Sequence, residues 1–243
     1  MSRFNKIDHD FYGAYIGNVN GYSNNLNYCL NYVLIDDSID YICLYGEKEN
    51  YSKTPNTCLA YYVFDKYFEG VDGLYNSIIY KQKERLEEYK QFFSQFRYVI
   101  SIDYSTYMSM GKNVIINQIA KSRIVCAWIN NNVPGCTCIP NITFSLEEYD
   151  DICLEGIVEG SSVAISLVSC LNNKEMRYRL DTIIKKVVDI IKPKNILVYT
   201  ESVKTDIYQV FKYAIDNQIQ LIIPSNKMKA RNEFLLEKKY GKR

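Results

Sequence analysis

The sequence predicts an α/β fold in which a mostly parallel sheet alternates with helices and curls into a barrel-like or incomplete-barrel arrangement. Six short runs rich in β-branched and aromatic residues end at polar positions, and nearly all are followed by a helical stretch. These runs cover residues 59–64, 98–102, 138–142, 163–168, 196–199 and 219–223. Helices of this length between strands imply right-handed parallel crossovers. Because the crossovers keep recurring, a barrel is favoured, with a doubly wound open sheet as the alternative.

The first 58 residues differ from the rest and form a predicted N-terminal layer rich in asparagine and tyrosine. Asparagine and glycine between positions 12 and 32 favour turns over long helices. A strand is expected over 41–45, before the first of the six runs. No Gly/Ser-rich or Pro-rich linker follows. Residues 1–226 are therefore predicted to form one domain, in which 59–226 holds the repeated strand-helix units.

The spacing of apolar residues predicts the helices between the strands. Helical spacing is found over 77–96 and again over 112–132, where Pro134 and Gly135 end the pattern. Ser145 and Glu148 form a capping-box pattern that opens a short helix. Two further helices are predicted, over 173–191 and 205–217.

Basic residues are concentrated at the end of a chain whose net charge is only +1. Between positions 227 and 243, seven basic residues stand against two glutamates. The seven are Lys227, Lys229, Arg231, Lys238, Lys239, Lys242 and Arg243. Residues 227–243 are therefore predicted to form a solvated amphipathic helix, or a helix or tail that binds DNA, RNA or an acidic partner.

Several classes of protein are disfavoured by what the sequence lacks. No stretch approaches the roughly eighteen uninterrupted apolar residues of a membrane span, and the N-terminus has no apolar signal core. A cytoplasmic protein that does not bind membranes is therefore expected. Most of the eight cysteines lie in apolar runs, as is typical of buried thiols in a reducing compartment. His9 is the only histidine, which disfavours mechanisms that use imidazoles in the body of the chain.

Three carboxylates stand at the ends of predicted strands: Asp65, Asp103 and Glu201. In parallel α/β folds ligands bind at the carboxyl ends of the strands. Three carboxylates without an imidazole are a ligand set that Mg²⁺ or Mn²⁺ prefers, and such an ion can activate water for phosphodiester cleavage. The alternative is that each acid caps or solvates the loop that follows its strand.

Other polar residues at the same strand ends are predicted to line a pocket with these acids. They are Asn141, Thr143, Ser169, Cys170 and Ser225. Cys170 precedes a predicted helix, which allows either an activated thiol or a buried structural one. Neither G-x-G-x-x-G nor the Walker loop occurs, which disfavours dinucleotide and P-loop chemistry.

Several of these segments together resemble a family catalogued as domain of unknown function 4417. The resemblance extends over about residues 59–199 and rests on 62–65, 99–105, 123–128, Gly135, 139–143, 160–166 and 193–199. This chain has Asp-Tyr-Ser at 103–105 where the family has Asp-Phe-Ser, and Ser169 where the family has glycine. The resemblance implies that the chain is encoded by a phage, plasmid or other mobile element.

Two classes of function follow from these observations. The first is a mobile-element protein that binds nucleic acid, or a host or phage protein, in replication or host interaction and performs no catalysis. The second is a Mg²⁺- or Mn²⁺-dependent phosphodiesterase or nuclease that uses Asp65, Asp103 and Glu201 as metal ligands. The distance between the three carboxylates discriminates between them, because they must share an ion in the second class.

Overall fold

The computed structural model describes residues 21–168, 170–171, 173–203 and 205–240. Its named strands form a five-stranded sheet in the order β4-β3-β2-β1-β8 and a three-stranded sheet in the order β5-β6-β7. All pairings between these strands are parallel, which confirms the predicted α/β class. The strands are β1 (Tyr41–Leu44), β2 (Thr57–Ala60), β3 (Tyr98–Ile100), β4 (Thr137–Ile139), β5 (Val163–Ser166), β6 (Asn195–Tyr199), β7 (Gln220–Ile222) and β8 (Ser225–Asn226).

The two sheets are joined at both ends in a barrel-like arrangement. An isolated parallel bridge pairs Asn141, just beyond β4, with Ala164 of β5. At the other end, only Ile223 and Pro224 separate β7 from β8, and β8 pairs with β1. The strands therefore follow one another in chain order and return to β1. The ladder is interrupted between β4 and β5 and between β7 and β8, so it is not a continuous closed ring.

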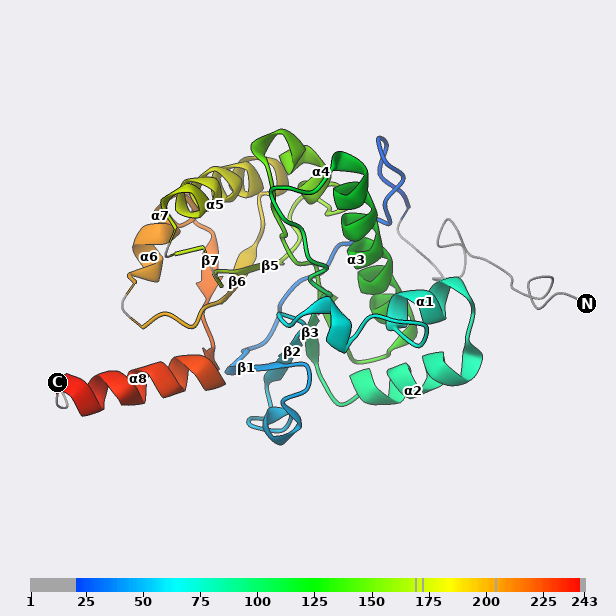
Figure 1. The fold of residues 1–243 in the computed structure, drawn as a ribbon, viewed down its shortest axis with the longest axis horizontal. Helices are drawn as coiled ribbons and strands as arrows, with labels where there is room; N and C mark the ends of the chain where they lie inside the picture. The colour runs from blue at the N-terminus through cyan, green and yellow to red at the C-terminus, as the bar shows by residue number, and fades with distance from the viewer. Residues whose placement is uncertain (1–20, 169, 172, 204, 241–243) are drawn as a thin grey trace, which may run out of the picture.

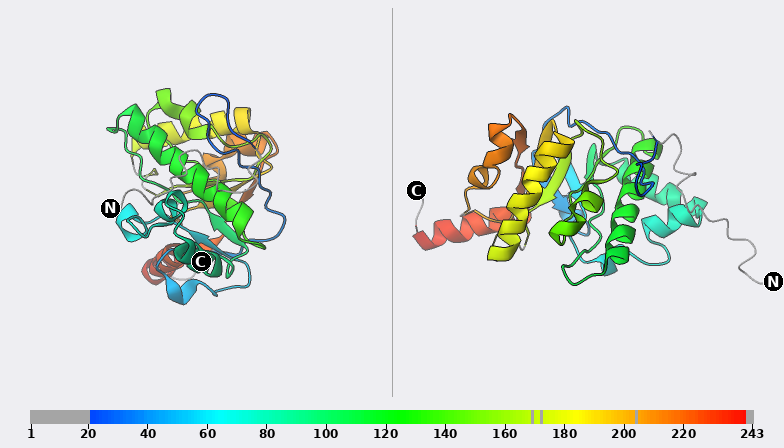
Figure 2. Two further views of the ribbon diagram at one scale, coloured as in Figure 1. Left: turned by 90° about the vertical axis from the view of Figure 1, so that its right-hand side faces the viewer. Right: turned by 90° about the horizontal axis from the view of Figure 1, so that it is seen from above.

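Helices flank both sheets, as Figures 1 and 2 show. They are α1 (Leu74–Ile79), α2 (Lys83–Phe93), α3 (Lys112–Asn132), α4 (Asp150–Leu154), α5 (Lys174–Lys186), α6 (Ile207–Val210), α7 (Lys212–Asp216) and α8 (Lys227–Tyr240). A π-helical segment, Val187–Ile191, continues α5. The helix predicted over 77–96 is divided into α1 and α2, because Lys81 adopts a left-handed backbone with φ of 52° that no continuous helix accommodates.

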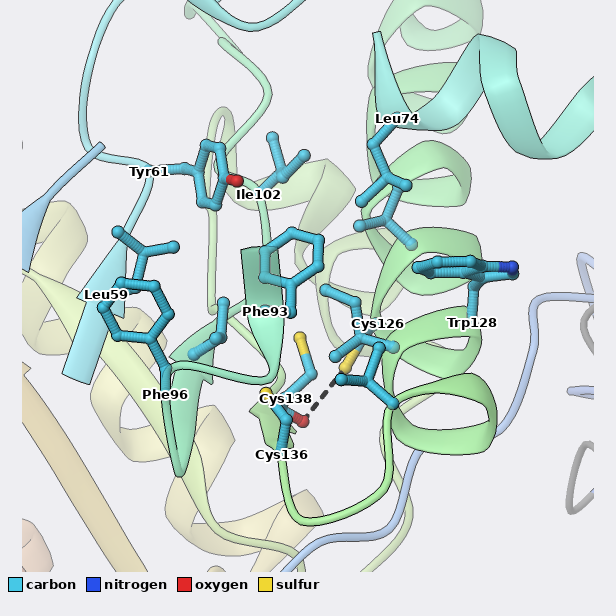
Figure 3. Close-up of a cluster of buried hydrophobic side chains, with 14 of the residues drawn as sticks. Leu59, Tyr61, Leu74, Phe93, Phe96, Ile102, Cys126, Trp128, Cys136 and Cys138 are labelled. Atoms are coloured by element: carbon cyan, nitrogen blue, oxygen red, sulfur yellow. Dashed lines mark hydrogen bonds between the residues drawn. The ribbon is translucent and has the colours of Figure 1, made fainter. Parts of the chain in front are cut away.

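The outer faces of the strands are covered by helices. Alternate residues of β1 to β4 pack with α1, α2 and α3 in one apolar cluster, part of which Figure 3 shows around Phe93 and Trp128. Alternate residues of β5 and β6 pack with α5, α6 and α7 in another. Because side chains alternate along a strand, the remaining residues of each strand face the other way.

The inner faces of both sheets meet in a single apolar cluster. It takes Ile42 from β1, Ile100 from β3, Ala164 from β5 and Leu197 from β6, all fully buried. At the carboxyl end of the strands, the centres of the Tyr62 and Tyr199 rings lie 5.0 Å apart. Strands from two separate sheets share this core, as the strands of a barrel do.

The described part of the N-terminal layer covers the amino ends of the strands. The backbone N–H groups of Val33 and Ile35 donate to the hydroxyls of Ser161 and Ser162, which precede β5. The carbonyl of Ile35 accepts a hydrogen bond from Asn195 at the start of β6. This leaves the opposite, carboxyl end of the strands open for a site. The boundary predicted at residues 58 and 59 falls inside β2.

None of the helices in the described ranges combines the length and apolar character that crossing a bilayer requires.

Candidate functional site

A cavity of about 590 Å³ lies at the carboxyl ends of the strands. Its polar lining includes Asp103, Asn141 and Thr143, which follow β3 and β4. Its larger apolar and aromatic lining includes Tyr62, Phe64, Tyr67, Tyr107, Phe144 and Met176. Parallel strands end together at this edge, which is why loops distant in sequence meet here.

Asp103 is held in place by a chain of hydrogen bonds across the cavity floor. The hydroxyl of Thr143 and the amide of Asn141 both donate to its Oδ1, at 2.6 and 2.9 Å. The hydroxyl of Tyr62 donates to Oδ1 of Asn141 at 2.8 Å, which orients the Asn141 amide toward Asp103. The backbone of Asn141 is held in turn by Arg123 of α3, whose fully buried guanidinium donates to the Asn141 carbonyl.

The surroundings of Asp103 favour its protonated form. The pKa of this carboxyl is raised to about 6, mainly by burial and in part by the nearby charge of Asp65, while the hydrogen bonds from Thr143 and Asn141 oppose the shift. Desolvation is the largest cause, and among the described residues the hydrogen bonds to Asp103 come from the neutral side chains of Thr143 and Asn141. A carboxyl that titrates near neutral pH in a cavity is typical of binding and catalytic sites.

Asp65 lies beside this cavity and has a structural role. Its carboxylate accepts hydrogen bonds from the backbone N–H and the hydroxyl of Ser105, which closes the loop after β3 onto the loop after β2. It lines an adjoining cavity of about 340 Å³ that shares Phe64, Ser105 and Tyr107 with the first. Asp65 therefore fits the alternative prediction, in which a strand-end acid accepts hydrogen bonds from the backbone N–H groups of a loop.

Glu201 is not brought together with the other two acids. It follows β6, where its carboxylate lies 3.4 Å from the hydroxyl of Tyr199, and it lines neither cavity. Within the described residues, no group of three or more histidine, cysteine, aspartate and glutamate side chains has a geometry that would hold a metal ion. The structure therefore does not assemble the expected three-carboxylate centre for Mg²⁺ or Mn²⁺, because Glu201 leaves β6 on another part of the rim.

Of the other residues predicted to line the pocket, Cys170 lines the cavity and Ser225 does not. Cys170 lines the cavity, but burial raises the pKa of its thiol to about 11, so it is protonated at neutral pH and is not an activated nucleophile. Ser225 pairs through its backbone with Tyr41 at the start of β1 and does not line the cavity. Ser169 and His9 lie outside the described residues.

The basic C-terminal segment forms α8, which extends away from the strands along the long axis of the molecule (Figures 1 and 2). Its inner side is held by Asn232, whose amide donates to the carbonyl of Glu201 at 2.8 Å. Its exposed side carries a basic and apolar stripe of residues spaced by three, four or seven positions, which lie on one helical face. This α8 stripe consists of Lys227, Arg231, Phe234, Leu235 and Lys238.

Charges on the α8 stripe are only partly compensated. Lys227 forms an ion pair with Glu49 at 2.8 Å. Arg231 and Lys238 have no acidic partner among the described residues. Lys229 instead faces a groove that it lines together with Glu233 and Glu237. Lys239 is also part of α8, whereas Lys242 and Arg243 lie outside the described residues.

Sequence reasoning found Asp103, Asn141 and Thr143 but missed the residues that hold and cover them. The hydrogen bonds from Tyr62 to Asn141 and from Ser105 to Asp65 were not expected, although each donor lies within two or three residues of a strand-end aspartate. That proximity is the signal that a search around each strand end could have used. Arg123 carried no such signal, because it lies in the middle of an amphipathic helix.

The family model described as Domain of unknown function (DUF4417) matches residues 36–216. No curated protein and no solved structure matches the chain. The matched range contains the cavity and its hydrogen-bond network, while α8 lies beyond it. Since the match spans more than half of the sequence, the chain belongs to the DUF4417 family.

Proposed function

We propose that this chain is a nucleic-acid-binding protein of a phage or plasmid, acting in the cytoplasm in replication or host interaction. The observation that carries the proposal is the α8 stripe. Arg231 and Lys238 lie one above the other on the exposed face of a helix that extends from the body, and no described acid pairs with them. The mobile-element setting rests on the sequence resemblance alone.

The chemistry of the stripe suits a phosphate backbone. Cationic side chains on one helical face reach successive phosphates and release condensed counterions when they do so. Between them, Phe234 is 64% exposed and Leu235 is 50% exposed. An exposed aromatic ring beside cations favours single-stranded nucleic acid, because an unpaired base can stack on it. Lys227 contributes less, since Glu49 already pairs with it.

Fluorescence anisotropy with labelled single- and double-stranded DNA and RNA tests this proposal. For the double variant Arg231→Gln/Lys238→Gln we expect affinity to fall about tenfold or more at low salt, and the slope of log K against log salt to become shallower by roughly 0.7–0.9 for each phosphate that the variant no longer neutralises. The matched control is Lys83→Gln/Lys194→Gln, which removes the same charge from exposed positions elsewhere. Equal affinity in the parent, the α8 variant and the control would overturn the proposal.

The metal-dependent nuclease is the second candidate, and the same preparation tests it. One observation favours it: the charge of Asp65 is close enough to raise the pKa of Asp103, so two of the three predicted ligands are neighbours. We expect bound but intact nucleic acid in the presence of Mg²⁺ or Mn²⁺. Cleavage that requires the metal and is lost in Asp103→Asn would establish the nuclease instead.

A further inference from the structure

We infer that the cavity at Asp103 binds an amino-substituted aromatic heterocycle of nucleobase size, which donates an N–H group to Asp103 and stacks on the aromatic lining. This goes beyond binding through α8, because it assigns a second, separate site. It also does not depend on the nucleic-acid proposal.

The hydrogen bonds around Asp103 leave one acceptor for a ligand. Both donors within the protein, Thr143 and Asn141, bond to Oδ1. Among the described residues nothing donates to Oδ2, and Asp103 lines the cavity. The network from Tyr62 through Asn141 holds the carboxyl in one orientation before a ligand arrives. A preorganised acceptor of this kind selects ligands that carry a donor.

The charges in the cavity exclude an anionic group near Asp103. Of the described residues that line it, none is lysine, arginine or histidine. Lys66 lines the adjoining cavity instead. A phosphate or carboxylate placed beside Asp103 would be desolvated next to a like charge. The site therefore suits a neutral or protonated ring, with any phosphate of the ligand directed toward solvent or Lys66.

Aromatic side chains at the mouth of the cavity supply the surface for the ring. Phe64 is 67% exposed, Tyr67 is 61% exposed and Tyr107 is 55% exposed. The ammonium group of Lys66 lies 5.1 Å from the centre of the Tyr67 ring, so a positive charge is placed next to these aromatic side chains. Exposed rings of this size that surround a cavity mark a binding surface. The volume of about 590 Å³ leaves room for a base with its sugar.

The ring could come from a free nucleoside-like molecule or from an unpaired base of a nucleic acid. Both sources present the same exocyclic amino group on a flat heterocycle. A base that enters a pocket is recognised by its hydrogen-bonding edge and by stacking, which are the two features of this cavity. The experiment therefore includes both sources.

Isothermal titration calorimetry of the full chain with matched nucleosides tests the inference. Adenosine is compared with purine riboside, and cytidine with pyrimidin-2-one riboside, because each pair differs only in the amino group. We expect the amino compound to bind at least about tenfold more tightly within at least one pair, because hydrogen bonds to charged acceptors are stronger than those between neutral groups. Equal affinities within both pairs, or no binding up to the solubility of the nucleosides, would overturn the inference.

Variants locate the site and separate it from α8. Asp103→Asn should abolish the preference for the amino compound, whereas Glu201→Gln removes a carboxylate outside the cavity and should leave it unchanged. Arg231→Gln/Lys238→Gln should weaken the binding of oligonucleotides but not the binding of nucleosides. If single-stranded oligonucleotides lose affinity in Asp103→Asn, an unpaired base is the source; if they do not, the ligand is a free molecule. A preference that persists in Asp103→Asn would place the site elsewhere.

Discussion

Asp103 shows at the scale of one residue how a binding site is maintained at a cost in stability. Its carboxyl has lost water, and among the described residues it accepts hydrogen bonds only from the neutral side chains of Thr143 and Asn141. A folded-state pKa above the unfolded value means that the native state binds the proton more tightly. Ionised Asp103 therefore destabilises the fold, and this cost disappears as the pH falls through about 6 toward the unfolded value.

Asp103→Asn is expected to be more stable than the parent at pH 8, by up to about 3 kcal/mol. The difference should shrink as the pH falls through about 6 and become small near pH 4, where the parent carboxyl is protonated in the folded state and partly protonated in the unfolded state. Tyr62, Cys170 and Asp65 are the titratable neighbours. The pKa values of Tyr62 and Cys170 are raised, so neither ionises in this range. Urea unfolding between pH 4 and pH 8 measures the effect.

The same measurement on Glu201→Gln provides the control, because Glu201 lies outside the cavity. A constant stability difference between Asp103→Asn and the parent over this range would show that burial does not raise the pKa of Asp103.

Asn226 joins two elements at the scale of secondary structure. Its Oδ1 accepts the backbone N–H of Lys229 at 2.9 Å in the first turn of α8, and its amide donates to the carbonyl of Thr200 at 2.8 Å. One buried side chain therefore caps the helix that carries the basic stripe and attaches it to the end of β6.

Asn226→Ala is expected to lower the free energy of unfolding by about 1–3 kcal/mol, because it removes a helix cap and leaves a carbonyl without its donor. Amide hydrogen exchange should accelerate in the first turn of α8 more than elsewhere. Asn232→Ala is the comparison, since it removes one hydrogen bond to Glu201 and no cap. A larger loss of stability in Asn232→Ala than in Asn226→Ala would contradict this account.

The capping pattern of Ser145 and Glu148 shows how tertiary contacts override a local signal. The hydroxyl of Ser145 donates to the carbonyl of Tyr107, 38 positions away in the sequence, and Leu146 occupies the position before the short 3₁₀ turn Glu147–Tyr149. Ser145 is buried, so its hydroxyl needs a partner in the interior. The predicted capping box is therefore wrong, although a short helix, α4, does follow.

At the scale of the whole molecule, the two sheets share one inner core, and we therefore expect them to unfold as one cooperative unit. Leu197 of β6 packs in the inner cluster with Ile42 and Ile100 of the first sheet. Trp128, the only tryptophan, lies on the outer side of the first sheet, far along the chain from β6. Its fluorescence therefore reports on one half of the molecule, while far-ultraviolet circular dichroism reports on the whole.

Leu197→Ala is expected to cost about 2–5 kcal/mol and to lower the melting temperature seen by tryptophan fluorescence and by circular dichroism equally. Ile190→Ala serves as the control, because Ile190 is 49% exposed and its truncation should have little effect. Two separate transitions, with fluorescence unaffected by Leu197→Ala, would show that the sheets unfold independently.

The sequence by itself determined the strand-helix alternation, the parallel class and the strand ends that carry Asp103, Asn141 and Thr143. These features follow from local periodicity and from the rule that ligands bind at the carboxyl ends of parallel strands. Helix α3 was predicted with its observed bounds, because its apolar spacing is helical and Pro134 and Gly135 follow it.

Only the tertiary structure decided which strand ends face one another. Asp103 and Glu201 occupy equivalent places in sequence, but the curvature of the sheets brings Asn141 and Tyr62 to Asp103 and leaves Glu201 beside Tyr199 and α8. The pKa of Asp103 also depends on burial by loops from three strands. Local pattern specifies which face of a strand is apolar, whereas the stagger and closure of the sheet arise from packing among all the strands.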